Sequence, residues 1–126
     1  MPNVRIVRFH RTGGPEVLQL DELPLPEPGA QEVRLRVKAI GVNRAEVMFR
    51  MGRYLVDPKL PSKIGYEASG IVEATGPDVD PSCVGKTVST VPAFPANEYG
   101  VYGEVAAISC SSRPRAAAWV SLPSRL

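Results

Sequence analysis

Residues 32–52 read EVRLRVKAIGVNRAEVMFRMG, and this stretch holds the two clearest structural signals of the chain. From Glu32 to Ile40 apolar and basic residues alternate with a period of two, which is typical of a strand with one buried face. The next run begins with Asn43, a good N-cap, has Glu46 three residues later and ends at Gly52. This spacing predicts a short helix with a near capping box.

The segment before this stretch predicts a β-hairpin followed by a connector. Apolar residues at both ends of residues 4–22 flank the turn Gly13-Gly14-Pro15. The following run ELPLPEPGAQE has prolines at positions 24, 26 and 28. Proline donates no ladder hydrogen bond, so we expect this run to be an extended connector rather than a strand.

The segment after this stretch predicts further short strands. Residues 67–74 form a run of small residues, in which Gly70 indicates a bend or a close backbone approach. Residues 86–91 and 102–108 are two more strand-like runs. Residues 109–126 carry five serines and three arginines with no acidic residue and no clear periodicity, so we expect an atypical tail, either truncated or disordered.

The bulk composition favours a mainly β protein and excludes several classes of partner. The 13 prolines and 11 glycines leave little room for long helices. A formal net charge of +2 gives no electrostatic case for nucleic acid or an anionic membrane. No stretch approaches the ~20 apolar residues of a membrane helix, and the N-terminus lacks a signal-peptide core. We therefore expect a cytoplasmic protein with two free thiols, and leave open whether it forms a homo-oligomer.

The common catalytic motifs are not met. CVGKT at 83–87 ends like a phosphate loop, but position 80 is aspartate where that motif needs glycine. The single histidine, His10, and the two cysteines make no metal-ligand spacing. There is no GxSxG elbow and no GxGxxG, so a nucleotide-binding Rossmann unit is absent from these 126 residues.

Several segments taken together resemble the N-terminal half of the medium-chain dehydrogenase/reductase superfamily. These segments are KAIGVNRAEVMFRMGRY, KIGYEASGIVEATG, GKTV and YGVYGEVA, and the opening GGPEVLQL resembles the quinone oxidoreductase branch in particular. The resemblance implies a GroES-like, partly open barrel with one or two short helices over residues 1–108, followed by the tail at 109–126. It also implies that a cofactor-binding Rossmann domain would normally follow.

The resemblance also implies a set of site residues and excludes zinc. Zinc alcohol dehydrogenases carry cysteine and histidine in the segments that match Asn43 and Tyr66, and amide and phenol are poor zinc ligands. The family's cleft residues match Asn43, Arg44, Glu46 and Met48 as contacts of the cofactor. Asn43, Tyr54 and Tyr66 match contacts of the substrate, although each of them can instead serve as a cap or as packing.

The activity implied by the resemblance is hydride transfer from NADPH to a small quinone or an enone, without a metal. NADPH binding would require the Rossmann domain, so the domain alone is expected to be inactive. Two alternatives remain open. One is a stand-alone GroES-like module for binding or assembly, and the other is part of an enoyl reductase of fatty acid or polyketide synthesis.

Overall fold

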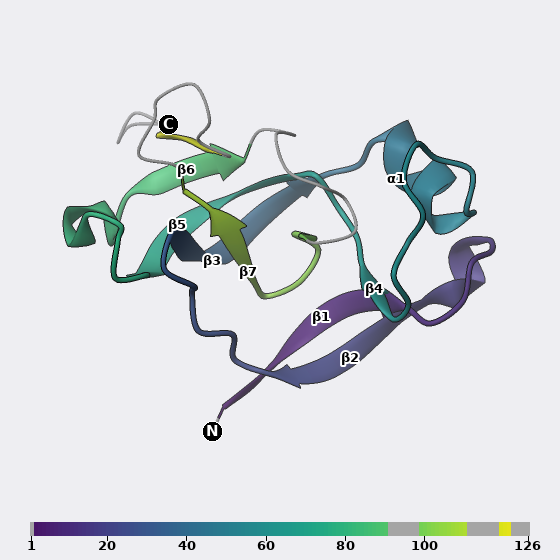
Figure 1. Cartoon of the computed structure of the whole chain (residues 1–126), viewed down its shortest axis with the longest axis horizontal. Coiled ribbons are helices and arrows are strands. Elements are labelled where there is room, and N and C mark those ends of the chain that lie inside the picture. The colour runs from purple at the N-terminus through teal and green to yellow at the C-terminus, as the bar shows by residue number, and fades with distance from the viewer. Residues whose placement is uncertain (1, 91–98, 111–118, 122–126) are drawn as a thin grey trace.

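The computed structural model describes residues 2–90, 99–110 and 119–121, which form two antiparallel sheets with one α-helix at one end of the molecule (Figure 1). The smaller sheet has the order β2-β1-β4 and the larger one β7-β3-β5-β6-β8. The strands are β1 (Asn3–Phe9), β2 (Leu18–Pro24), β3 (Glu32–Gly41), β4 (Ser62–Lys63), β5 (Glu67–Thr75), β6 (Thr87–Thr90), β7 (Val105–Ser109) and β8 (Trp119–Ser121). The helices are α1 (Arg44–Arg50) and the 3-10 turns η1 (Pro15–Val17) and η2 (Pro81–Cys83).

The two sheets approach each other without closing a barrel. Residues 102–104 run beside β1: the Val7 N–H donates to the Tyr102 carbonyl, and the Glu104 N–H donates to the Arg5 carbonyl, both at 2.9 Å. An isolated bridge joins Ile6 to Gly103 between these bonds. The expected mainly β fold, with a partly open barrel and one short α-helix, is confirmed.

The strongest sequence signals correspond to the central strand pair and the helix. β3 lies between β5 and β7, and its residues Val33 and Leu35 are fully buried. The register of β3 against β5 shifts between Val37 and Ala39. Here Gly70 faces the Arg36 carbonyl so closely that a Cβ would collide with it, which confirms the close backbone approach expected at this glycine.

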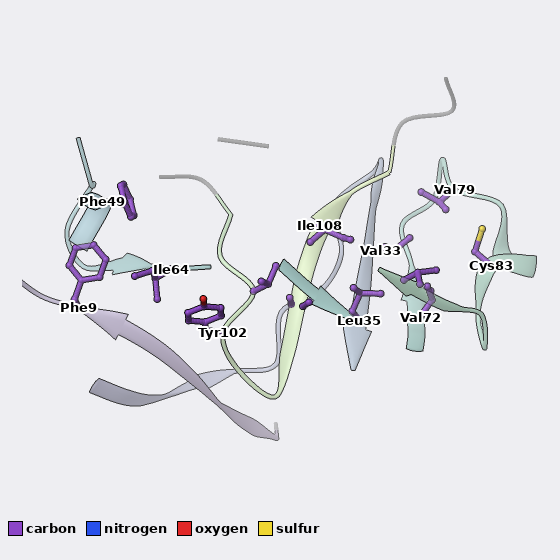
Figure 2. Packing of buried hydrophobic residues seen from close by; sticks show 14 of the residues in the cluster. Phe9, Val33, Leu35, Phe49, Ile64, Val72, Val79, Cys83, Tyr102 and Ile108 are labelled. Carbon is purple, nitrogen blue, oxygen red and sulfur yellow. The ribbon is translucent and has the colours of Figure 1, made fainter. Parts of the chain in front are cut away.

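The larger of two buried hydrophobic clusters runs through the space between the sheets. At one end the rings of Phe9 and Phe49 meet edge to face, with centroids 5.6 Å apart (Figure 2). At the other end Val79 and Cys83 cover β5. The Phe49 contact fixes α1 against the hairpin, because the helix buries this aromatic side chain.

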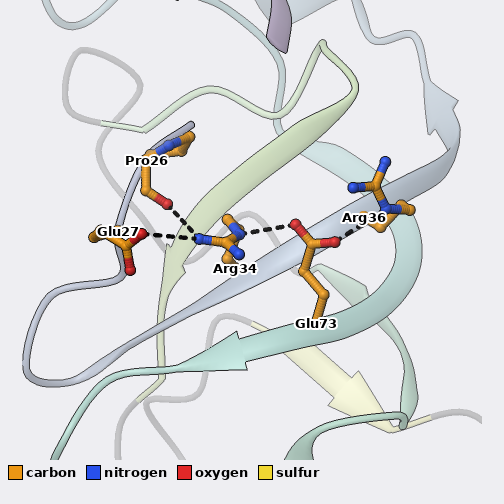
Figure 3. A network of polar contacts seen from close by, with 5 residues as sticks. All are labelled: Pro26, Glu27, Arg34, Arg36 and Glu73. Atoms are coloured by element: carbon orange, nitrogen blue, oxygen red, sulfur yellow. Dashed lines mark hydrogen bonds and ion pairs between the residues drawn. The ribbon is translucent and has the colours of Figure 1, made fainter. Parts of the chain in front are cut away.

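Charged side chains pair across the outer face of β3 and β5 (Figure 3). Arg34 Nε donates to Glu73 at 2.8 Å and Arg36 Nε donates to the other oxygen of Glu73 at 3.0 Å. Arg34 also donates to the Pro26 carbonyl at 2.9 Å. The basic face of the predicted alternating strand is therefore tied to the neighbouring strand and to the 25–31 connector.

Three strand predictions were wrong in their bounds. β2 continues to Pro24, which was expected to lie in the connector. Since β2 is an edge strand, a proline at its end leaves the ladder to β1 intact. The expected strand at 102–108 begins only at Val105, because residues 102–104 pair with β1 instead. β6 spans Thr87–Thr90 of the expected 86–91, and residue 91 lies outside the described residues.

The predicted tail contains a strand that its sequence did not indicate. β8 pairs antiparallel with β6 and forms the edge of the larger sheet. The Cys110 N–H also donates to the Gln31 carbonyl at 2.7 Å. Residues 111–118 and 122–126 lie outside the described residues, so the boundary at 108 stays a prediction.

Candidate active site

A buried carboxylate joins the start of α1 to the loop before β5. Glu46 is 4% exposed. One of its oxygens, Oε2, accepts a hydrogen bond from the Asn43 N–H at 2.6 Å, as expected for a helix whose N-cap is Asn43. The other oxygen, Oε1, accepts from the Tyr66 N–H at 3.1 Å. The side chain that closes the cap therefore also holds a residue 20 positions away.

The Asn43 side chain points to another segment of the same cluster. Its Nδ2 donates to Glu67 Oε2 at 3.0 Å, and Asn43 has the extended backbone of an N-cap. The Glu67 carboxylate therefore links the start of β5 to the start of α1. Asn43 and Glu67 are exposed, so the amide and the carboxylate reach the surface of the domain.

Two tyrosines lie together beside this carboxylate. Tyr54 and Tyr66 are partly buried and both pack against the hydrophobic core. Burial first of all, then the contact with Tyr54 and the charge of Glu46, raises the pKa of Tyr66 to about 12. Tyr66 therefore keeps its phenolic proton at neutral pH and is able to donate a hydrogen bond.

Two further residues complete the cluster and were not singled out from the sequence. Thr90, in β6, donates its hydroxyl to the Tyr66 carbonyl at 2.8 Å and accepts from the Ala68 N–H at 3.0 Å. Tyr102 donates its hydroxyl to the Gly41 carbonyl at 2.7 Å. Burial and then the charge of neighbouring Glu46 raise the pKa of Tyr102 to about 12. The only sequence signal was the pair of glycines that flank Val101-Tyr102.

The remaining predicted cofactor contacts lie on the surface of α1. Arg44 is exposed, and Met48 is 40% exposed. Met48 is one of several exposed large apolar side chains between residues 40 and 60, which we together call the α1 apolar surface. Its large apolar side chains are Ile40, Val42, Val47, Met48, Met51, Leu55, Val56 and Leu60. Exposed apolar side chains that lie this close together in the sequence are candidates for an interaction surface.

Among the described residues, no three histidine, cysteine, aspartate or glutamate side chains gather closely enough to hold a metal ion. His10 is exposed and its Nε2 lies 2.7 Å from Asp21 Oδ2, on the hairpin of the smaller sheet. Asn43 and Tyr66 approach the same Glu46 carboxylate from two segments. The expectation that this domain binds no zinc stays a prediction.

Comparison with known proteins places this chain in a family. Residues 29–113 match the alcohol dehydrogenase GroES-like domain, and this match spans more than half of the chain. The chain belongs to that family.

Several relatives of this GroES-like domain are quinone oxidoreductases. It is 40% identical over 99 residues to the quinone oxidoreductase of Pseudomonas aeruginosa and 39% identical over 99 residues to that of Salmonella typhimurium. Each match covers 79% of this chain and 29% of the relative. A 2-haloacrylate reductase from a Burkholderia species is 40% identical over 84 residues, covering 65% of this chain and 25% of the relative. The chain thus spans under a third of the length of these relatives.

Solved structures give the same result for the fold. The quinone oxidoreductase of Pseudomonas syringae pv. tomato has a TM-score of 0.82 at 34% identity, covering 98% of this chain and 34% of that one. The Escherichia coli quinone oxidoreductase complexed with NADPH has a TM-score of 0.79 at 31% identity, and the match covers 97% of this chain and 34% of that one. The resemblance to the quinone oxidoreductase branch of the medium-chain dehydrogenase/reductase superfamily is confirmed.

None of the helices in the described residues has the length and apolar character needed to span a bilayer.

Proposed function

We propose that this GroES-like domain forms the substrate-side wall of an NADPH-dependent reductase that acts on a small quinone or an activated alkene. The observation that carries the proposal is the meeting of Asn43, Tyr54 and Tyr66 at one cluster, in a chain similar to quinone oxidoreductases. The similarity to a 2-haloacrylate reductase supports an activated alkene as the alternative acceptor.

The residues present at the start of α1 fit a nicotinamide contact. Asn43 offers an exposed amide, Arg44 a cation and Met48 a partly exposed apolar side chain. Glu46 was predicted as a cofactor contact, but both of its oxygens accept backbone hydrogen bonds and it is buried. We therefore propose that Glu46 positions the site without touching the cofactor. NADPH, when bound, supplies the hydride.

The α1 apolar surface is the proposed contact with a cofactor-binding domain. The described residues contain no glycine-rich turn between a strand and a helix, which a pyrophosphate site requires. A cleft between this surface and a second domain would exclude water from the hydride donor and the acceptor. The division into a GroES-like domain at 1–108 and a tail at 109–126, the location in the cytoplasm and the oligomeric state stay predictions.

We also propose that the reaction uses no zinc in this domain. A phenol whose pKa is raised to about 12 holds its proton at neutral pH, and zinc ligands must be deprotonated or neutral nitrogen donors. The Asn43 amide is no better as a ligand. Metal analysis after incubation with zinc chloride and gel filtration tests this, and stoichiometric zinc that is lost in the variant N43A would contradict it.

The experiment that tests the function compares this chain with a chimaera. In the chimaera the chain replaces the matching N-terminal part of the Pseudomonas aeruginosa quinone oxidoreductase, and that enzyme itself is the positive control. Titration calorimetry with NADPH should show binding by the chimaera and none at micromolar concentration by the 126-residue chain. When a quinone or a 2-haloacrylate is added, the chimaera should then oxidise NADPH, which is measured as a fall in absorbance at 340 nm. A chimaera that binds NADPH but reduces no member of either class would refute the proposal.

A further inference from the structure

Buried polar side chains bind both the N–H and the carbonyl of Tyr66. Its N–H donates to Glu46 of α1 at 3.1 Å, and its carbonyl accepts from Thr90 of β6 at 2.8 Å. Glu46 and Thr90 are 4% and 5% exposed. Buried hydrogen bonds of this kind are costly to leave unmade, so the two side chains fix where the Tyr66 backbone lies. We call Glu46 and Thr90 the Tyr66 clamp.

The residue before Tyr66 is fixed as well. Gly65 has a φ of +108°, which other residues rarely adopt. A Cβ at this position would lie 2.6 Å from Cε1 and 2.9 Å from Cγ of Tyr102, so the ring packs directly on the glycine. The Tyr102 hydroxyl is anchored at 2.7 Å to the Gly41 carbonyl at the end of β3. The positive φ of Gly65 and its contact with the Tyr102 ring therefore fix the direction in which the backbone enters Tyr66.

The Tyr66 side chain ends next to that of Tyr54, which comes from the loop after α1. Tyr54 is close enough to raise the pKa of Tyr66, and both tyrosines are partly exposed and pack against the core. They lie beside the start of α1, where the α1 apolar surface begins. This arrangement presents hydroxyl groups at the edge of an apolar surface, which is the composition of a site for a small, mostly apolar molecule with one polar end.

We propose that the Tyr66 clamp consists of positioning residues that hold the Tyr66 phenol beside Tyr54, where this hydroxyl pair binds the carbonyl oxygen of the acceptor. The inference rests on the proposed function, because it names the groups that would recognise a quinone or an enone. It assigns to Glu46 and Thr90 a role that acts through Tyr66 and not on the substrate itself.

The chemistry requires a hydrogen-bond donor at this oxygen. As hydride from NADPH adds to the acceptor carbon, NADPH becomes NADP⁺ and an electron pair moves onto the carbonyl oxygen, which then takes one proton from water. A neutral phenol stabilises the developing negative charge by donating a hydrogen bond and keeps its own proton. The high pKa of Tyr66 agrees with a donor of this kind and not with a general acid at neutral pH.

The test uses the 126-residue chain labelled with ¹³C at the tyrosine Cζ atoms, whose four signals are assigned with Tyr→Phe variants. The ligand is duroquinone, whose methyl groups block addition of the cysteine thiols. Isosteric T90V removes the clamp hydroxyl, T90S restores it, and E46Q removes one of the two acceptors of Glu46. Y99F is the matched control, because Tyr99 donates its hydroxyl to Glu32, outside this cluster.

The clamp is supported if T90V loses the nuclear Overhauser effect between the rings of Tyr54 and Tyr66, and if the pKa of Tyr66 falls by about one unit. T90S should restore both, and Y99F should change neither. If T90V does not fold, E46Q must lose the same nuclear Overhauser effect; its Tyr66 pKa is left out of the test, because removing the charge of Glu46 lowers that pKa by itself. A folded T90V or E46Q with an unchanged Tyr66 signal overturns the clamp, whatever the activity of the chimaera.

The carbonyl site is tested separately by affinity. Y66F should weaken duroquinone binding about three- to tenfold, which is the loss expected for one neutral hydrogen bond, while Y99F should bind as the unmodified chain does. Equal affinity of Y66F and the unmodified chain overturns the carbonyl site. A chimaera that reduces quinones equally well with Y66F would also overturn it while leaving the proposed function intact. A chimaera without any reductase activity contradicts the proposed function and leaves the clamp measurements valid.

Discussion

The contact between Gly65 and Tyr102 makes a quantitative prediction, because a second glycine supplies its control. Gly65 and Gly85 have φ angles of +108° and +92°, so alanine at either position is strained. The two sites differ in what a Cβ would meet. At Gly65 it would strike the buried Tyr102 ring, and at Gly85 there is nothing within 4 Å. The difference between G65A and G85A therefore isolates the cost of the collision.

The expected free energies follow from these two geometries. An L residue in left-handed backbone costs about 1–2 kcal/mol, and we expect G85A to lose this amount of unfolding free energy. G65A should lose it as well, together with about 1–3 kcal/mol for forcing a methyl group into packed surroundings. Movement of the Tyr102 ring would also break its bond to the Gly41 carbonyl, which adds about 1 kcal/mol.

Urea unfolding followed by tryptophan fluorescence or circular dichroism measures both variants. With a slope of about 2 kcal/mol per molar urea, the midpoint for G65A should lie about 1–2 M below that for G85A. Tyr102 is 9% exposed, so its ring has little room to move aside. Equal midpoints for G65A and G85A would show that the ring yields freely, and the reasoning about the turn before Tyr66 would then be refuted.

Two further predictions concern charge and pH. The unfolding free energy should fall as pH rises from about 10 to about 12, because the phenols of Tyr66 and Tyr102 hold their protons more tightly when folded (pKa about 12) than when unfolded (10.0). After a discount for solvent screening, the loss should be about 1 kcal/mol per tyrosine, and urea titrations at several pH values should show a flatter profile for Y66F than for the unmodified chain. E73Q should lower the free energy of unfolding, measured with urea, by about 1–2 kcal/mol. The substitution removes the charge that pairs with Arg34, whose side chain is 12% exposed. The matched change E27Q, at a glutamate whose side chain is 76% exposed and 3.8 Å from Arg34, should cost nothing measurable; equal losses for the two variants would contradict the assignment.

Local pattern was sufficient where a residue's environment follows from its near neighbours. The alternation from Glu32 to Ile40 predicted β3, because a strand with one buried face repeats every two residues. Asn43 and Glu46 predicted the start of α1, because capping joins residues three apart. Gly70 predicted a close backbone approach, although its neighbour, the Arg36 carbonyl, became known only from the structure.

The predictions failed where pairing with a distant segment decides the structure. β8 is three residues long and has no periodicity of its own, so only its pairing with β6 makes it a strand. Residues 102–104 look like the start of β7, but their hydrogen bonds go to β1. Backbone groups bond to whatever strand lies alongside, and that neighbour is not encoded in the local run of residues.

The sequence by itself determined the family, the mainly β fold and the identity of Asn43, Tyr54 and Tyr66 as candidate site residues. The mainly β fold follows from alternation and turn residues that can be read along the chain, whereas the family and the site residues follow from the resemblance of several segments to a known family. Only the tertiary structure decided that Glu46 is a buried link and not a surface contact, and that Thr90 and Tyr102 belong to the same cluster. The physical reason is distance in sequence: the bonds from Tyr66 to Glu46 and Thr90 span 20 and 24 residues, and that from Tyr102 to Gly41 spans 61. Such contacts exist only once the two sheets have brought their loops together.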